Sequence, residues 1–137
     1  VFALGGESSL PQALTFSPRE LSPPELAASP EVVALGGELY GQHCSVCHGT
    51  GGQMRGANFP NLLVTPLLHS QPGFDQVVIE GIREDKGMVS FAERVDADGS
   101  DAIRWFLVAQ ATEQMNATPL APPEDAETTE DVHDEEE

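Results

Sequence analysis

Two cysteines and a histidine lie within five consecutive residues, Cys44-Ser45-Val46-Cys47-His48. Side chains three residues apart project from the same face of a helical turn, so both thiols can reach the two vinyl groups on one edge of a porphyrin. The histidine that follows can then turn its imidazole toward the iron. This spacing is the covalent attachment signature of a c-type haem, with His48 as the proximal ligand of the iron.

Paired cysteines also serve two other chemistries. A thioredoxin-like redox pair usually starts a helix that follows a strand, whereas a helical pattern precedes Cys44 and no βαβ pattern follows it. A structural zinc site needs four ligands, usually supplied as two pairs, and His69 stands alone, 21 residues after His48. Haem attachment is the preferred interpretation, with the redox pair and the zinc site as alternatives.

The sixth ligand of a haem iron decides between electron transfer and gas binding or catalysis. The candidates are three methionines and two histidines: Met54, Met88, Met115, His43 and His69. Met88 lies 40 residues after His48, in a segment predicted to be non-helical and long enough to reach the distal face. Met54 is too near His48 in sequence, and His43 shares a helix with Cys44. We therefore expect Met88 to be the distal ligand.

Helices must hold these residues in place. The apolar periodicity predicts helices over residues 30–43, 71–83 and 97–113. Each follows a residue whose side chain can accept hydrogen bonds from the first amides of a helix, the N-caps Ser29, Ser70 and Asp96. The connections over residues 49–69 and 84–95 are long for so small a domain, which suggests that a ligand organises them.

A glycine within the first predicted helix requires a packing reason. Gly36, Tyr40 and Cys44 share one stripe of that helix. Glycine in a helix costs about 1 kcal/mol relative to alanine, so we expect another helix to approach closely at Gly36. Ile103 and Phe106 of the last predicted helix are the expected contacts.

Further residues are expected to complete a haem site. A backbone carbonyl of the segment Pro60-Asn61-Leu62 can accept the proton on the second nitrogen of His48, which would fix the tautomer. Arg55 and Arg83 are candidate partners of the haem propionates. Burial of the haem should raise its reduction potential. The apolar side chains expected to provide that burial are Leu62, Leu67, Val78, Ile82 and Phe91.

Composition and charge exclude several kinds of partner. The 137 residues include 23 Asp and Glu and 6 Lys and Arg, a net charge of -17, and Lys86 is the only lysine. So acidic a chain is not expected to bind a phosphate backbone, which excludes nucleic acid. No apolar run is long enough to predict a membrane span.

The chain divides into three expected parts. Residues 1–29 are rich in proline and predict an extended linker, whose first residues could be the remnant of a preceding domain. Residues 30–117 should form the folded domain. Residues 118–137 should be a disordered acidic tail, because nine of the fourteen residues from Glu124 to Glu137 are Asp or Glu.

Taken together, these residues resemble the class I cytochromes c over about residues 30–115. The matching motifs are Gly36-x-x-x-Tyr40, Cys44-Ser-Val-Cys47-His48, Pro60-Asn61-Leu62, Gly87-Met88 and Ile103-x-x-Phe106. The resemblance implies an all-α cytochrome c fold, with three to four short helices and long loops around one covalently bound haem. It also implies that the Pro60 carbonyl holds His48 and that Met88 is the distal ligand.

A narrower resemblance covers the middle of the chain. The run Pro60-Asn-Leu…Pro66-Leu-Leu…Phe74-x-x-Val-Val-x-x-Gly81-Ile-Arg83…Gly87-Met-Val-Ser-Phe91 is similar to the C-terminal cytochrome domain of quinohaemoprotein alcohol dehydrogenases. In those enzymes a β-propeller that carries pyrroloquinoline quinone (PQQ) comes first, then a proline-rich linker, then the cytochrome. The first residues, Val1-Phe-Ala-Leu-Gly-Gly, look like the last propeller strand before that linker.

The resemblance implies an electron-transfer domain that is not an enzyme by itself. The PQQ dehydrogenase domain would be the electron donor, and a soluble redox protein or terminal oxidase the acceptor. Covalent haem attachment further implies export to the periplasm. The alternatives are a free-standing periplasmic electron-shuttle cytochrome, and a haem sensor or peroxidase-like enzyme with an open distal site. An interaction module without haem, built on a disulfide between Cys44 and Cys47, is a further alternative.

Overall fold

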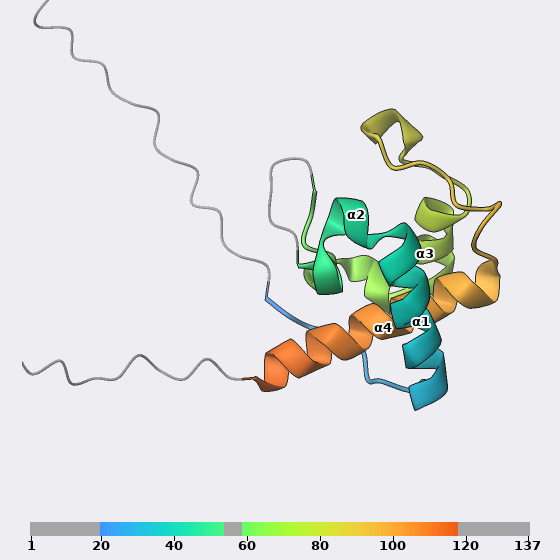
Figure 1. Cartoon of the computed structure of the whole chain (residues 1–137). Helices are drawn as coiled ribbons and strands as arrows, with labels where there is room; N and C mark the ends of the chain where they lie inside the picture. Colours follow the sequence, from blue (N-terminus) through green and yellow to red (C-terminus); the bar gives the residue numbers. More distant parts are fainter. Residues whose placement is uncertain (1–19, 54–58, 118–137) are drawn as a thin grey trace, which may run out of the picture.

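The computed structural model describes residues 20–53 and 59–117, and this part of the chain contains helices and no strand (Figure 1). The α-helices are α1 (Pro30–His43), α2 (Ser45–His48), α3 (Gln71–Val78) and α4 (Ala97–Asn116). Four short 3-10 turns connect them: η1 (Thr50–Gly52), η2 (Leu62–Val64), η3 (Pro66–His69) and η4 (Glu84–Lys86). The prediction of an all-α protein is confirmed. The expected acidic tail, residues 118–137, lies outside the described residues.

Helix α1 begins and ends at the predicted residues. The Ser29 hydroxyl accepts a hydrogen bond from the Val32 amide at 3.4 Å, and Pro30 occupies the first turn, where its missing N–H costs nothing. At the other end, the Cys44 amide donates to the Tyr40 carbonyl at 2.9 Å. The helix therefore leads directly into the cysteine motif.

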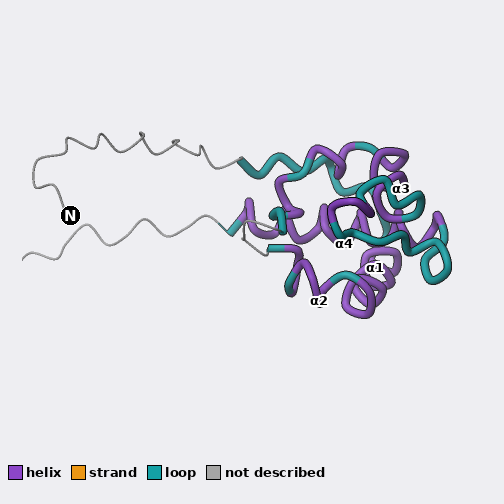
Figure 2. Tube along the Cα trace, turned by 90° about the horizontal axis from the view of Figure 1, so that it is seen from above, coloured by secondary structure: helices purple, strands orange, loops and turns teal. Residues whose placement is uncertain are grey.

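The crossing of α1 and α4 forms the centre of the fold (Figure 2). A Cβ atom added at Gly36 would overlap the carbonyl group of Ala102 in α4, so only glycine allows the two backbones to come this close. Next to this contact, the rings of Tyr40 and Phe106 lie 5.3 Å apart between their centroids. The predicted close approach at Gly36 is confirmed, with the backbone at Ala102 as the neighbour that requires it.

Helix α3 is shorter than predicted. Its N-cap is Ser70, as expected, and the Ser70 hydroxyl accepts from the Gly73 amide at 3.1 Å. The helix ends at Val78 rather than at Arg83, because the chain reverses at Gly81, whose φ of 68° is left-handed. Ile82 therefore lies beyond the end of the helix, and its side chain is 56% exposed. Its contact with the haem stays a prediction.

Helix α4 supplies much of the buried core. The Asp96 carboxylate accepts from the Gly99 amide at 2.8 Å, as predicted for its N-cap, and the helix continues to Asn116, three residues past its predicted end. Its buried hydrophobic side chains are Ala102, Ile103, Leu107, Val108 and Ala111.

A buried arginine that was not among the predicted core or site residues ties α4 to the connection before α3. Arg104 donates through one guanidinium nitrogen to the Leu68 carbonyl at 2.8 Å and through another to the Asp101 carboxylate at 2.6 Å. Its guanidinium carbon lies 4.3 Å from the centroid of the Trp105 ring. Because each contact satisfies part of the buried cation, Arg104 can hold η3 against α4.

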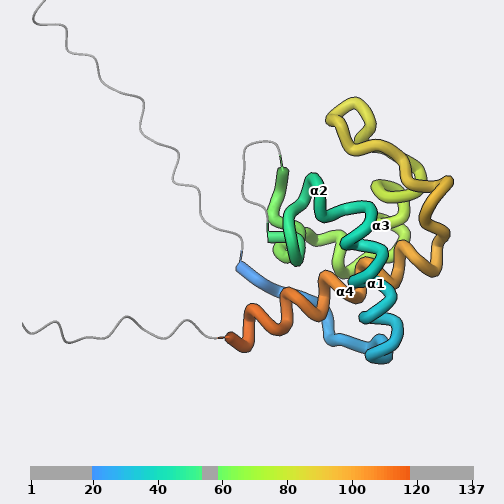
Figure 3. Tube along the Cα trace, viewed as in Figure 1, coloured from blue at the N-terminus to red at the C-terminus, as the bar shows by residue number. Residues whose placement is uncertain are grey.

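The described end of the expected linker, residues 20–29, runs in an extended conformation into α1 (Figure 3). Leu21 packs against the core, and the Ser22 carbonyl lies 2.7 Å from Nε2 of His69. A carbonyl can only accept, so this ring nitrogen donates. No helix of the described residues combines the length and the apolar character needed to cross a membrane.

Candidate functional site

The cysteine motif occupies a single helical turn. Cys44 ends α1 and caps α2, and the amides of Cys47 and His48 both donate to the Cys44 carbonyl, at 3.2 and 3.0 Å. Cys44 is half-buried, Cys47 is exposed, and both are free thiols. Because residues three apart share a face of such a turn, the two thiols are arranged to react with one flat group.

Burial keeps the Cys44 thiol protonated. It raises the pKa of Cys44 to about 11, and the neighbouring Cys47 adds to the shift. The redox cysteines of thioredoxin-like proteins have a lowered pKa and begin a helix after a strand. Cys44 instead follows a helix of 14 residues and has a raised pKa. These observations weigh against the redox pair.

Tyr40 holds the chain directly after His48, an arrangement that the sequence does not predict. Its hydroxyl donates to the Gly49 carbonyl at 2.6 Å. Gly49 has φ 72° and ψ 168°, a conformation that other residues avoid. Burial raises the pKa of Tyr40 to about 12, with a contribution from Cys44, so the phenol remains a donor at neutral pH.

His48 has a buried, neutral imidazole ring, which suits a metal ligand. Its side chain is only 8% exposed, and burial lowers its pKa, which favours the neutral imidazole that binds metal. Its Nδ1 atom is buried and has no hydrogen-bond partner among the described residues. Such unsatisfied buried groups are rare in folded proteins. The residues present therefore fit a metal-bearing cofactor placed on this ring.

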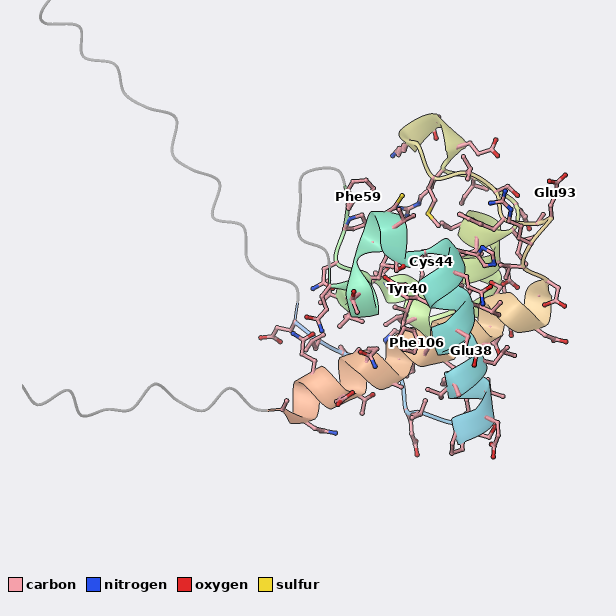
Figure 4. The ribbon with its side chains drawn as sticks, in the orientation of Figure 1. Glu38, Tyr40, Cys44, Phe59, Glu93 and Phe106 are labelled. Carbon is pink, nitrogen blue, oxygen red and sulfur yellow. The ribbon has the colours of Figure 1, made fainter. Side chains whose placement is uncertain are left out.

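The segment before η2 lies beside His48. The ring of Phe59 stands edge-on to the imidazole, with 6.1 Å between centroids, and Figure 4 places Phe59 next to α2. Pro60 is exposed, and no hydrogen bond links its carbonyl to His48 in the described part of the chain. The bond between Pro60 and His48 stays a prediction.

Met88 packs on the same core as the cysteine motif. It is half-buried and contacts the buried cluster, as do three other candidate site residues, Cys44, Leu62 and Phe91. The exposed Met115 lies in the last turn of α4, and Met54 lies outside the described residues. Among the methionines of the described residues, Met88 is therefore the one that packs against the buried cluster, as Cys44 does.

The histidines set aside as ligands occupy different surroundings. His69 is exposed and bonded to Ser22. His43 is half-buried, and its ring centroid lies 6.3 Å from that of Phe91, three residues past Met88. His43 thus faces the segment that carries Met88, a position that its place in sequence did not predict.

The remaining candidates differ in burial. Leu67 packs against the buried cluster, and Val78 belongs to it. Arg83 is exposed and makes no side-chain hydrogen bond in the described part, which leaves it able to meet a propionate. Arg55 lies outside the described residues. Residues 20–53 and 59–117 contain no group of three or more His, Cys, Asp or Glu that could hold a metal ion, so a zinc site finds no support there.

The helix order, the crossing at Gly36 and the motif after α1 define the cytochrome c fold. Comparison with known proteins leads to a particular group. The chain is 33% identical over 124 residues to quinohemoprotein alcohol dehydrogenase ADH IIB of Pseudomonas putida, covering 90% of this chain and 18% of that protein. It is 29% identical over 113 residues to 1-butanol dehydrogenase (cytochrome c) of Thauera butanivorans, covering 80% of this chain and 16% of that protein.

A third relative is quinohemoprotein alcohol dehydrogenase of Comamonas testosteroni, 27% identical over 112 residues, covering 80% of this chain and 15% of that protein. No family model matches the chain. The chain spans less than a fifth of the length of these relatives. The resemblance to a class I cytochrome c, similar to the cytochrome domain of quinohaemoprotein alcohol dehydrogenases, is confirmed.

Proposed function

We propose that this chain carries one covalently attached haem c and transfers single electrons. Cys44 and Cys47 would form the two thioether bonds, His48 would bind the iron on one face, and Met88 would bind it on the other. Bound in this way, the haem supplies a couple of ferrous and ferric iron that accepts and releases one electron. The observation that carries the proposal is the single helical turn that presents both thiols beside a buried, incompletely bonded imidazole.

The surroundings of these residues favour electron transfer over ligand binding. Met88 and Cys44 both pack on a core of aliphatic and aromatic side chains, among them Leu63, Val78 and Leu107. A low-polarity site disfavours the extra charge of the ferric state, and a thioether ligand favours ferrous iron, so both raise the reduction potential. A held methionine also leaves no open position for gases or peroxide. The open-site sensor or peroxidase is therefore the weaker alternative.

The names of the relatives support a dehydrogenase as the electron donor. Two of them are named quinohemoprotein alcohol dehydrogenase ADH IIB and 1-butanol dehydrogenase (cytochrome c). We infer that a PQQ dehydrogenase domain reduces this chain and that a soluble redox protein or terminal oxidase oxidises it. The chain alone would not be an enzyme. Covalent haem attachment would imply export to the periplasm, and residues 1–29 would serve as the linker from the donor domain.

A reduction assay tests the donor. The oxidised, haem-bearing chain is mixed without oxygen with a primary alcohol and a PQQ-dependent alcohol dehydrogenase that has no cytochrome of its own. We expect the haem absorbance to show reduction by one electron per chain, and only when alcohol and dehydrogenase are both present. A chain that dithionite reduces but the dehydrogenase does not would refute the donor. A chain that dithionite cannot reduce would refute the electron carrier itself.

A further inference from the structure

The residues around Met88 form an arch whose second end is fixed on the end of α3. The Met88 arch is defined as residues 83–90. At its first end, the Met88 amide donates to the Arg83 carbonyl at 3.2 Å, and the Gly87 amide donates to the Glu84 carbonyl at 3.0 Å. Gly87 takes the left-handed φ of 91° that this tight turn requires. Met88 therefore lies where this short loop closes.

Ser90 fixes the second end. Its hydroxyl donates to the Ile79 carbonyl at 2.5 Å and accepts from the Ala92 amide at 3.2 Å. The following residue adds a backbone bond, because the Phe91 amide donates to the Val78 carbonyl at 2.8 Å. One hydroxyl thus joins the arch to a carbonyl just past the end of α3, where a helix otherwise leaves its last carbonyls unpaired.

Glu84 closes the arch across its base. Its carboxylate accepts from the Ser90 amide at 3.2 Å, so the two ends of the arch are tied directly to each other. The fit is tight, because a Cβ atom at Gly81 would lie 2.9 Å from the Cβ of Ser90 and 3.0 Å from the Glu84 carboxylate. Gly81, which ends α3 early, is what allows Ser90 to come this close.

The geometry points to Ser90 as a positioning residue for Met88, with Glu84 as its support. This inference rests on the proposed ligation of iron by Met88. Only Val89 separates Met88 from Ser90, so the hydroxyl bond limits how far the backbone of Met88 can move away from the core. Ser90 would act by keeping the thioether on the iron, and it would not touch the iron itself.

The test measures how readily an outside ligand replaces Met88. Imidazole binds ferric haem only when the methionine has left, so its apparent affinity reports the opening of that bond. We expect Ser90→Ala to tighten imidazole binding by about fivefold, the effect of losing one hydrogen bond. Glu84→Ala, at an exposed position, should act in the same direction by about twofold. Thr112→Val removes a hydroxyl that bonds to the Val108 carbonyl at 2.8 Å within α4, and it should leave the affinity unchanged.

A double-mutant cycle separates positioning from general loosening of the site. In the Met88→Ala background, Ser90→Ala should no longer change the imidazole affinity, because no thioether remains to be positioned. The inference would be overturned if Ser90→Ala changed the imidazole affinity equally in both backgrounds. It would also be overturned if neither Ser90→Ala nor Glu84→Ala changed that affinity in the chain that keeps Met88. If Met88→Ala alone leaves imidazole binding unchanged, the ligation of iron by Met88 is what fails.

Discussion

Replacing Met88 with alanine should lower the reduction potential on the order of 100 mV or more, because the axial ligand is a major determinant of haem potentials. The thioether favours ferrous iron, so its loss makes the ferric state relatively more stable. It also leaves an open position on the iron. The ferrous chain should then bind carbon monoxide readily at neutral pH. The weak red absorption band that marks a bond between methionine and ferric iron should disappear. Potentiometric titration and absorption spectra measure these changes.

Met115→Ala is the matched control, since Met115 is exposed in the last turn of α4. It should leave the potential, the red band and carbon monoxide binding as they are. The half-buried His43 beside Phe91 provides a further comparison. A variant that lacks both Met88 and His43 shows whether that imidazole occupies the vacated position. An unchanged potential in Met88→Ala would mean that another residue is the distal ligand.

Gly36→Ala should be the most destabilising single substitution in α1. The added methyl group would overlap the carbonyl group of Ala102, which is backbone and cannot rotate away. Forcing α1 and α4 apart would also separate Tyr40 from Phe106. We expect a loss of about 3 kcal/mol or more in the free energy of unfolding, at or above the upper range for overpacking. Urea denaturation of the haem-bearing chain measures it.

The same helix offers a control for the glycine effect. Gly41 is exposed, and a Cβ atom there would meet nothing within 4 Å. Gly41→Ala should therefore stabilise the chain by about 0.5–1 kcal/mol, the ordinary gain of alanine over glycine in a helix. Equal effects of the two substitutions would contradict the close crossing of α1 and α4.

Local signals in the sequence predicted the helix starts well. Three helices begin where expected, at the N-caps Ser29, Ser70 and Asp96. A cap can be predicted because it depends on a few neighbouring residues. The end of α3 was less predictable. The apolar spacing continues to Ile82, although α3 ends at Val78. The one sign of this early end in the sequence is Gly81, which takes a left-handed conformation.

In the candidate site, too, features of consecutive residues could be predicted, and contacts between distant residues could not. The spacing of Cys44, Cys47 and His48 is local, so the sequence alone is enough to propose a chemistry for the motif. The bonds from Tyr40 to Gly49 and from Arg104 to Leu68 connect residues brought together only by folding. The sequence pattern marks Tyr40 for its place on the stripe with Gly36, but it does not predict the bond to Gly49, and it does not mark Arg104 at all. The contact between His43 and Phe91 was hidden for the same reason.

The mass of the purified chain tests the central claim most directly. The protein is produced in a periplasm with active cytochrome c maturation and then extracted with acid acetone, which removes haem that is not covalently bound. We predict that the chain keeps the mass of one haem, and that a variant with Cys44→Ala and Cys47→Ala loses it. A colourless chain with the mass of the bare polypeptide, made under the same conditions, would contradict the account.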